Sequence, residues 1–243
     1  MNKKRRKILK TIAATVLSGP FMMFNSSCAG TEAEEKQGIF LKNDKLQTIK
    51  KDYKGNFLKN GKFAGQYTTD VNNITPFKIL KWKLSANPKA EAKKKDSFSL
   101  KIIKHNSLPT CNDDYIMWLG HASLLIHLNG KYIITDPCLT SPPFVPRQSA
   151  IPLKIKKLKA DYLLISHGHY DHLDSDTLQA LNGNKIKALV PLRMGSVVKS
   201  MNDNIAVQEA GWYQQYDVGG VEFFLLPAQH WHKRTATDLN KVL

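Results

Sequence analysis

The stretch Ser166-His167-Gly168-His169-Tyr170-Asp171-His172 comes directly after the apolar run Asp161–Ile165. An apolar run of that length predicts a buried β-strand, and the glycine gives the chain after it the freedom to turn sharply. Three histidines and an aspartate therefore follow the end of one strand, where a single turn can aim several of them at one point. Imidazole and carboxylate groups suit zinc, iron or manganese, so this stretch predicts a metal site.

The ligand count predicts two metal ions. A catalytic site usually keeps three protein ligands and one open position, and His167 and His169 supply two of the three. The third is expected to be His230, which follows the apolar run Val221–Leu226, with the nearby His232 as its alternative. Asp171 and His172 would overfill that tetrahedral site, so they indicate a second metal.

Two further residues are expected to support the site from outside the ligand set. Asp136 follows the apolar run Lys131–Thr135 and could hold a ligand histidine or the backbone of the motif; the alternative is a simple turn cap. His121 either faces the same end of the sheet or is an ordinary structural histidine. His105 and His127 are expected at the surface.

The surrounding pattern predicts an α/β layered domain. Asn129-Gly130 separates two β-prone runs, which is a strong hairpin signal, and a helix opened by Asp174 or Ser175 is expected over residues 173–181. Strands that alternate with helices carry functional loops at their ends. The expected strands are Tyr115–Leu119, Ser123–Leu128, Lys131–Thr135, Asp161–Ile165, Lys187–Val190 and Val221–Leu226.

The positive charge is concentrated in the N-terminal part of the chain. Residues 1–110 carry 23 Lys and Arg against 8 Asp and Glu, a net +15 of the total +16. Residues 1–28 resemble an export signal and residues 29–60 a polar tether, and the folded domain is expected over residues 61–243. A short helix is expected over residues 77–84, either packed on the domain or touching a membrane.

The same N-terminal part predicts the location of the protein. Cys28 follows small residues, as in a bacterial lipoprotein processing site, and Arg5-Arg6 resembles a twin-arginine export signal. We therefore expect an exported protein, either a membrane-anchored lipoprotein or one that is periplasmic or on the cell surface. The lysines accompany no nucleic-acid-binding module, so no nucleic acid is expected as a partner. They indicate a solvated charged surface or, as the alternative, contact with an anionic membrane surface beside the N-terminal anchor.

Several motifs together resemble the metallo-β-lactamase superfamily. Within it the chain looks most like the N-acyl-phosphatidylethanolamine-hydrolysing phospholipase D group, over residues 61–243. The motifs that carry the likeness are the histidine stretch, Trp118-Leu119-Gly120-His121-Ala122-Ser123, Thr135-Asp136-Pro137, Pro227-Ala228-Gln229-His230-Trp231 and Lys233-Arg234-Thr235.

This resemblance implies an α/β fold of the αββα sandwich type. It also implies that the partner is a lipid or small phosphodiester, which is hydrolysed at two zinc ions; iron or manganese are the alternative metals. His167, His169 and His230 would bind one ion, and Asp171, the candidate catalytic residue, would bind the other with His172. Family members continue past the Lys-Arg-Thr segment and supply a bridging Asp and a last His there, so we expect a sandwich that is incomplete at its C-terminus. The alternatives are hydrolysis of lactones or other esters, and a truncated, inactive metal-binding lipoprotein.

Overall fold

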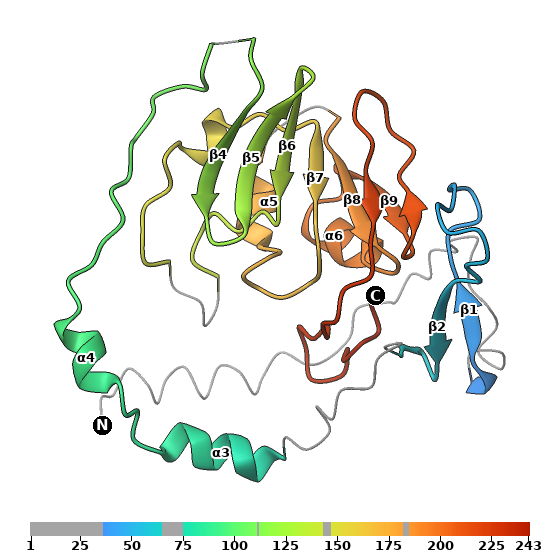
Figure 1. Ribbon diagram of the computed structural model, residues 1–243, viewed down its shortest axis with the longest axis horizontal. Helices are drawn as coiled ribbons and strands as arrows, with labels where there is room; N and C mark the ends of the chain where they lie inside the picture. Colours follow the sequence, from blue (N-terminus) through green and yellow to red (C-terminus); the bar gives the residue numbers. More distant parts are fainter. Residues whose placement is uncertain (1–35, 65–74, 111, 143–146, 182–184) are drawn as a thin grey trace.

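One six-stranded mixed sheet organises the chain, with two short helices on one of its faces (Figure 1). The computed structural model describes residues 36–64, 75–110, 112–142, 147–181 and 185–243. The expected export signal, including Cys28, lies outside these residues. The mixed sheet with helices packed on it agrees with the predicted α/β fold of the metallo-β-lactamase type.

The order of the sheet is β4-β5-β6-β7-β8-β9, and its pairing changes halfway across. The first three strands form antiparallel hairpins, whereas β6 to β9 run parallel to one another. Asn129 and Gly130 both have positive φ angles, 50° and 72°, as the predicted hairpin turn requires. The strands are β4 (Tyr115–Gly120), β5 (Ser123–Leu128), β6 (Lys131–Thr135), β7 (Tyr162–Leu164), β8 (Lys187–Pro191) and β9 (Ala206–Ala210).

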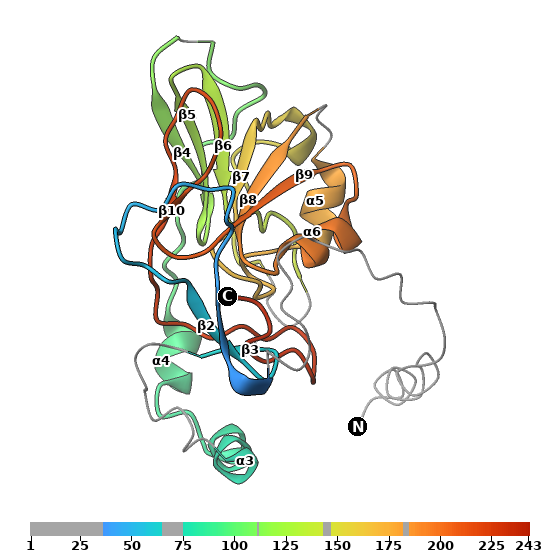
Figure 2. The same cartoon turned by 90° about the vertical axis from the view of Figure 1, so that its right-hand side faces the viewer.

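Both faces of the parallel strands are covered by apolar side chains. In β7, Leu163 belongs to the main core with residues of α5 (Ser175–Ala180) and α6 (Gly195–Met201). Its neighbour Leu164 faces the other way and packs beside a smaller cluster that holds Phe223. Figure 2 shows the short β10 (Gln214–Gln215), whose antiparallel partner is β11 (Phe224–Leu225), near the sheet. The strand predicted over residues 221–226 is thus paired over two residues alone.

The structure of the sheet region differs from the sequence prediction in two ways. Helix α6 and strand β9 were not predicted, because both are short and carry mixed apolar and polar residues. His127 was expected at the surface, but it is only 7% exposed. Its ring lies against Tyr115 and Tyr132, and its Nδ1 is 2.9 Å from the carbonyl oxygen of Asp113. The prediction was wrong because buried and partly buried side chains alternate along β5, and His127 is on the buried side, which neighbouring aromatic rings cover.

The segment that was expected to be a polar tether contains ordered structure from residue 36 onward. Strands β1 (Ile39–Leu41) and β2 (Asn56–Lys59) form a small antiparallel sheet with β3 (Lys62–Phe63). Leu58 is fully buried in a cluster that also contains Leu192, which follows β8. A few apolar residues on alternating positions are enough to dock this polar-looking segment on the domain.

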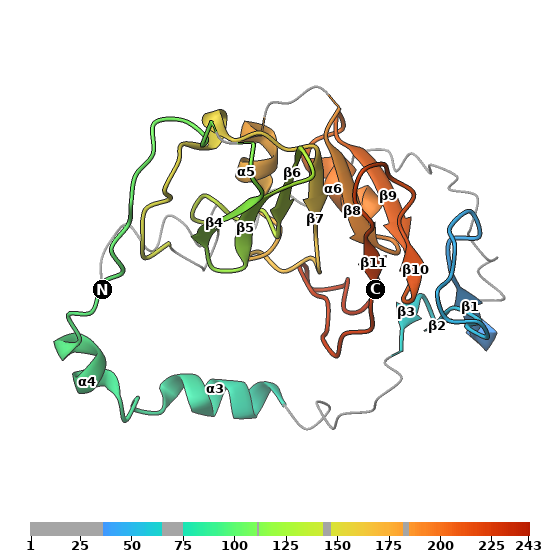
Figure 3. The same ribbon diagram turned by 45° about the horizontal axis from the view of Figure 1, so that its top comes forward.

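The helix predicted over residues 77–84 is present as α3 (Pro76–Leu84), and a second short helix, α4 (Ala90–Lys95), follows it. Thr75 caps α3 by accepting a hydrogen bond from the backbone N–H of Lys78, and Pro76 begins the helix. Figures 1 and 3 draw both helices apart from the sheet, and Phe77, Trp82 and Leu84 are each more than 70% exposed. Packing on the domain, one of the two expected roles, is therefore not observed.

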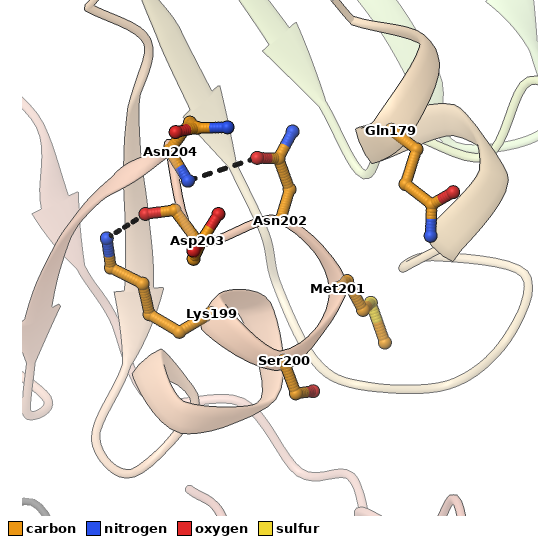
Figure 4. Close-up of a pocket in the computed structure, with 7 residues that line it drawn as sticks. All are labelled: Gln179, Lys199, Ser200, Met201, Asn202, Asp203 and Asn204. Atoms are coloured by element: carbon orange, nitrogen blue, oxygen red, sulfur yellow. Dashed lines mark hydrogen bonds between the residues drawn. The ribbon is translucent and has the colours of Figure 1, made fainter.

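The described residues contain no helix that is both long and apolar enough to cross a membrane. A pocket of ≈ 450 Å³ lies between α5, α6 and the turn before β9 (Figure 4). In it, Lys199 Nζ donates to the carbonyl oxygen of Asp203, and the N–H of Asn204 donates to Asn202 Oδ1. The polar groups of this pocket serve the helix–strand connection, and none of the predicted site residues lines it.

Candidate metal centre

The predicted site residues meet at one edge of the sheet. The parallel strands β6 and β7 both end at this edge, so that Asp136 and the histidine stretch 166–172 are brought together. Strand β5 runs antiparallel to β6 and therefore begins at the same edge. The hydroxyl of Ser123 donates to the backbone oxygen of Asp136, 2.6 Å away, which ties the β4–β5 turn to the end of β6.

A first cluster consists of three histidine rings. His167 Nε2 lies 3.0 Å from His169 Nδ1, and His230 Nε2 lies 3.2 Å from the same atom. The three nitrogen atoms thus converge on one point from two segments that are about sixty residues apart in the sequence. Of the two histidines left open by the sequence, it is His230 that joins this cluster.

The surroundings of this cluster favour neutral imidazoles. Burial, together with the neighbouring His172, His169 and His230, lowers the pKa of His167 to about 3. Burial and the nearby His230 likewise lower the pKa of His169. A neutral imidazole offers a lone pair to a metal ion, whereas a protonated one does not. His167 and His169 are therefore ready to bind a metal at neutral pH without first losing protons.

A second cluster lies beside the first. Asp171 Oδ2 is 3.1 Å from His121 Nε2 and 3.7 Å from His172 Nε2, and the three groups could share one ion. Burial acts to raise the pKa of Asp171, but a backbone hydrogen bond and the neighbouring His172 and His121 outweigh it and hold this pKa below its ordinary value. The carboxylate is therefore ionised at neutral pH, as a metal ligand must be.

Asp136 holds both the motif backbone and a histidine, the two contacts expected of it. Its carboxylate accepts hydrogen bonds from the backbone N–H of Ser166 at 2.7 Å and from the Ser166 hydroxyl at 2.8 Å. It also lies 2.8 Å from His172 Nδ1, and this contact raises the pKa of His172 against the effect of burial. With Nδ1 held in this way, His172 presents Nε2 to the second cluster.

Gly168 has a different role from the one predicted. It does not adopt a positive φ, but a Cβ at this position would clash with Cε1 of His232. His232 is only 3% exposed, and its ring lies directly against Gly168. The glycine is therefore needed for space, and His232 fills the volume that supports the histidine stretch.

Arg234 is the residue at this site that sequence reasoning missed. Its guanidinium donates from Nη1 to the backbone oxygens of Gly168, at 2.7 Å, and Leu173, at 2.8 Å. It also stacks on the ring of Tyr170, whose hydroxyl donates to the Arg234 backbone oxygen. One half-buried cation thus fixes both ends of the histidine turn. The only sequence signal for it was its place in the Lys-Arg-Thr motif.

The residues present fit the binding of metal ions. Each cluster offers three nitrogen or oxygen atoms that lie within 4.8 Å of one another, and the donors are imidazole and carboxylate groups. Both types suit zinc, iron and manganese, so the donor set does not select among these metals. Three protein ligands with the remaining side exposed to solvent is the usual arrangement of a catalytic rather than a structural site.

Comparisons with known proteins agree with this geometry. Residues 131–242 match the family model described as the β-lactamase superfamily domain. An uncharacterised protein of Mycobacterium tuberculosis is 34% identical over 128 residues, which are 49% of this chain and 34% of that protein. An N-acyl-phosphatidylethanolamine-hydrolysing phospholipase D of Caenorhabditis elegans is 32% identical over 143 residues, 52% of this chain and 40% of that protein. A metal-dependent hydrolase of Flavobacterium johnsoniae is 34% identical over 109 residues, 44% of this chain and 45% of that protein. The chain spans less than half the length of each of these relatives.

Proposed function

From the premise that residues 131–242 match the family model of the β-lactamase superfamily domain, we propose that this protein is a metal-dependent hydrolase of phosphodiesters, with N-acyl phospholipids as the substrate class. The observation that carries the proposal is the convergence of His167, His169 and His230 on one point beside the Asp171 cluster. The similarity to a phospholipase D supports the choice of a phosphodiester.

In this proposal, His167, His169 and His230 bind one zinc ion, while Asp171 and His172 bind a second. Iron or manganese would suit the same ligands. Bound metal ions would activate water at neutral pH and stabilise the charge on a displaced oxygen. The chain itself keeps His167 and His169 neutral, keeps Asp171 ionised and fixes His172 through Asp136.

The choice of substrate is tested by comparing two chromogenic compounds, a bis(nitrophenyl) phosphodiester and a nitrophenyl carboxylic ester. We expect the zinc-loaded chain to hydrolyse the phosphodiester, and a chelator to abolish that turnover. His105 is exposed and lies outside both clusters, so His105→Ala serves as the matched control and should keep full activity. Turnover of the ester or a lactone alone would refute the phosphodiester assignment. Metal binding without turnover of either compound would support the alternative that this protein is an inactive metal-binding lipoprotein.

We further propose that the segment around α3 and α4 lies on an anionic membrane surface, as suits an exported, membrane-anchored protein. Residues 76–104 carry nine lysines against two acidic residues, a net +7. Phe77, Leu80 and Leu84 line one shallow groove of α3 and are all exposed. Apolar side chains flanked by lysines are the pattern of a segment that binds at the lipid–water interface.

Binding to anionic vesicles tests this surface. Near such a membrane a lysine contributes about 1 kcal/mol, so replacing Lys93, Lys94 and Lys95 together with glutamate should weaken binding by about 100-fold or more. Replacing the exposed Lys154, Lys156 and Lys157 in the same way gives a control of equal charge change. Equal co-sedimentation of the two triple variants, or equal binding to neutral and anionic vesicles, would contradict the proposal.

A further inference from the structure

The turn between β4 and β5 holds His121 in an uncommon and well-fixed conformation. His121 has a φ of 50° and follows Gly120, whose φ is 108°. The indole Nε1 of Trp118 donates to the His121 backbone oxygen at 2.9 Å, and the guanidinium of Arg147 donates to the backbone oxygen of Leu119. The turn is thus held on both sides, and its geometry directs the imidazole toward the histidine stretch.

Two independent contacts place this imidazole in the second cluster. His121 Nε2 lies 3.1 Å from Asp171 Oδ2, and its ring centroid is 5.1 Å from that of His172. One ligand atom from each of the three residues falls within 4.8 Å of the others. The His121 side chain is also 54% exposed, so a small molecule can reach the point where the three groups meet.

We infer that His121 is a direct ligand of the second metal ion, together with Asp171 and His172. Asp171 and His172 alone provide two ligands, one fewer than a catalytic site usually has, and His121 is the third group that the described residues offer there. This inference rests on the proposed function. The competing role is that of a positioning residue that only holds Asp171 by a hydrogen bond.

Titration of the metal-free full chain with cobalt(II), followed by visible absorption and elemental analysis, separates these roles. The informative variant is His121→Gly, because glycine accepts the positive φ without strain. We expect wild type and the control His105→Gly to bind two equivalents, and His121→Gly to bind one tightly, with affinity for the second lowered more than 100-fold. Loss of a positioning residue usually costs about 10–100-fold and would leave the cobalt spectrum unchanged.

Added imidazole provides a second readout that does not depend on activity. The exposed site left by His121→Gly should accept free imidazole, which should restore the second equivalent and its absorption band. Two equivalents in His121→Gly with the wild-type spectrum would overturn the inference, as would a wild-type chain that binds only one. If the wild-type chain binds one equivalent, the first cluster and the proposal of a metal-dependent hydrolase would still stand, whereas the second ion assigned to Asp171 and His172 would be refuted. A wild-type chain that binds no metal would refute the proposed function itself.

Discussion

Replacing His169 with alanine is expected to lower phosphodiester turnover by about 10³-fold or more. His169 Nδ1 is the common neighbour of His167 Nε2 and His230 Nε2, at 3.0 and 3.2 Å, so its loss leaves the first cluster with only two of its three ligands. A bound metal contributes several kcal/mol to the stabilisation of the transition state, and each 1.36 kcal/mol corresponds to a tenfold change in rate. The measurement is kcat/KM of the zinc-loaded variant beside its metal content.

Two comparisons keep this result interpretable. The ring of Trp231 packs against His169 with centroids 4.4 Å apart, so the thermal unfolding temperature must show that the variant is still folded. His105→Ala makes the same chemical change at an exposed position outside the site. A folded His169→Ala chain that keeps turnover within about tenfold of wild type would exclude this cluster as the catalytic metal site.

Replacing Asp136 with alanine should destabilise the fold and weaken the second metal site together. The change leaves three donors without their acceptor, namely the Ser166 N–H, the Ser166 hydroxyl and the ring of His172. Ser166 is exposed, so water can replace part of its contacts, and we expect a loss of about 1–3 kcal/mol in the free energy of unfolding, most of it from the half-buried ring of His172. Release of His172 should also lower metal affinity by about 10–100-fold.

Chemical denaturation and metal titration measure the two effects separately. Asp176→Ala is the matched control, because Asp176 is exposed on α5 and its loss should change stability by only about 0.5 kcal/mol. If Asp136→Ala were as stable as this control and bound metal like wild type, Asp136 would not be the group that organises the histidine turn.

Local sequence signals predicted much of the sheet correctly. The hairpin around Asn129-Gly130 followed from the need for positive φ angles, and the start of α5 followed from Asp174, whose side chain accepts from the Thr177 N–H. Both features depend on interactions within a few residues. The short α6 and β9 were missed, since elements of this kind acquire their structure from packing on the core rather than from their own pattern.

The composition of the candidate site was also partly predictable. The histidine stretch and His230 each follow an apolar run, and strand ends that share a sheet edge bring such residues together. The positions of His121 and His232 could not be fixed in this way, because they depend on the pairing of β5 with β6 and on packing behind Gly168. Once the antiparallel pairing of β5 with β6 is known, the β4–β5 turn, and with it His121, must lie at the same edge of the sheet as Asp136.

The most direct test of the account is the metal content of the purified wild-type chain, measured by elemental analysis after equilibration with zinc and removal of free metal. The two clusters, His167 with His169 and His230, and Asp171 with His172 and His121, predict two equivalents per chain. A folded chain that retains no metal would contradict the account, because the convergence of these histidine and aspartate side chains at the sheet edge would then have no ligand to explain it.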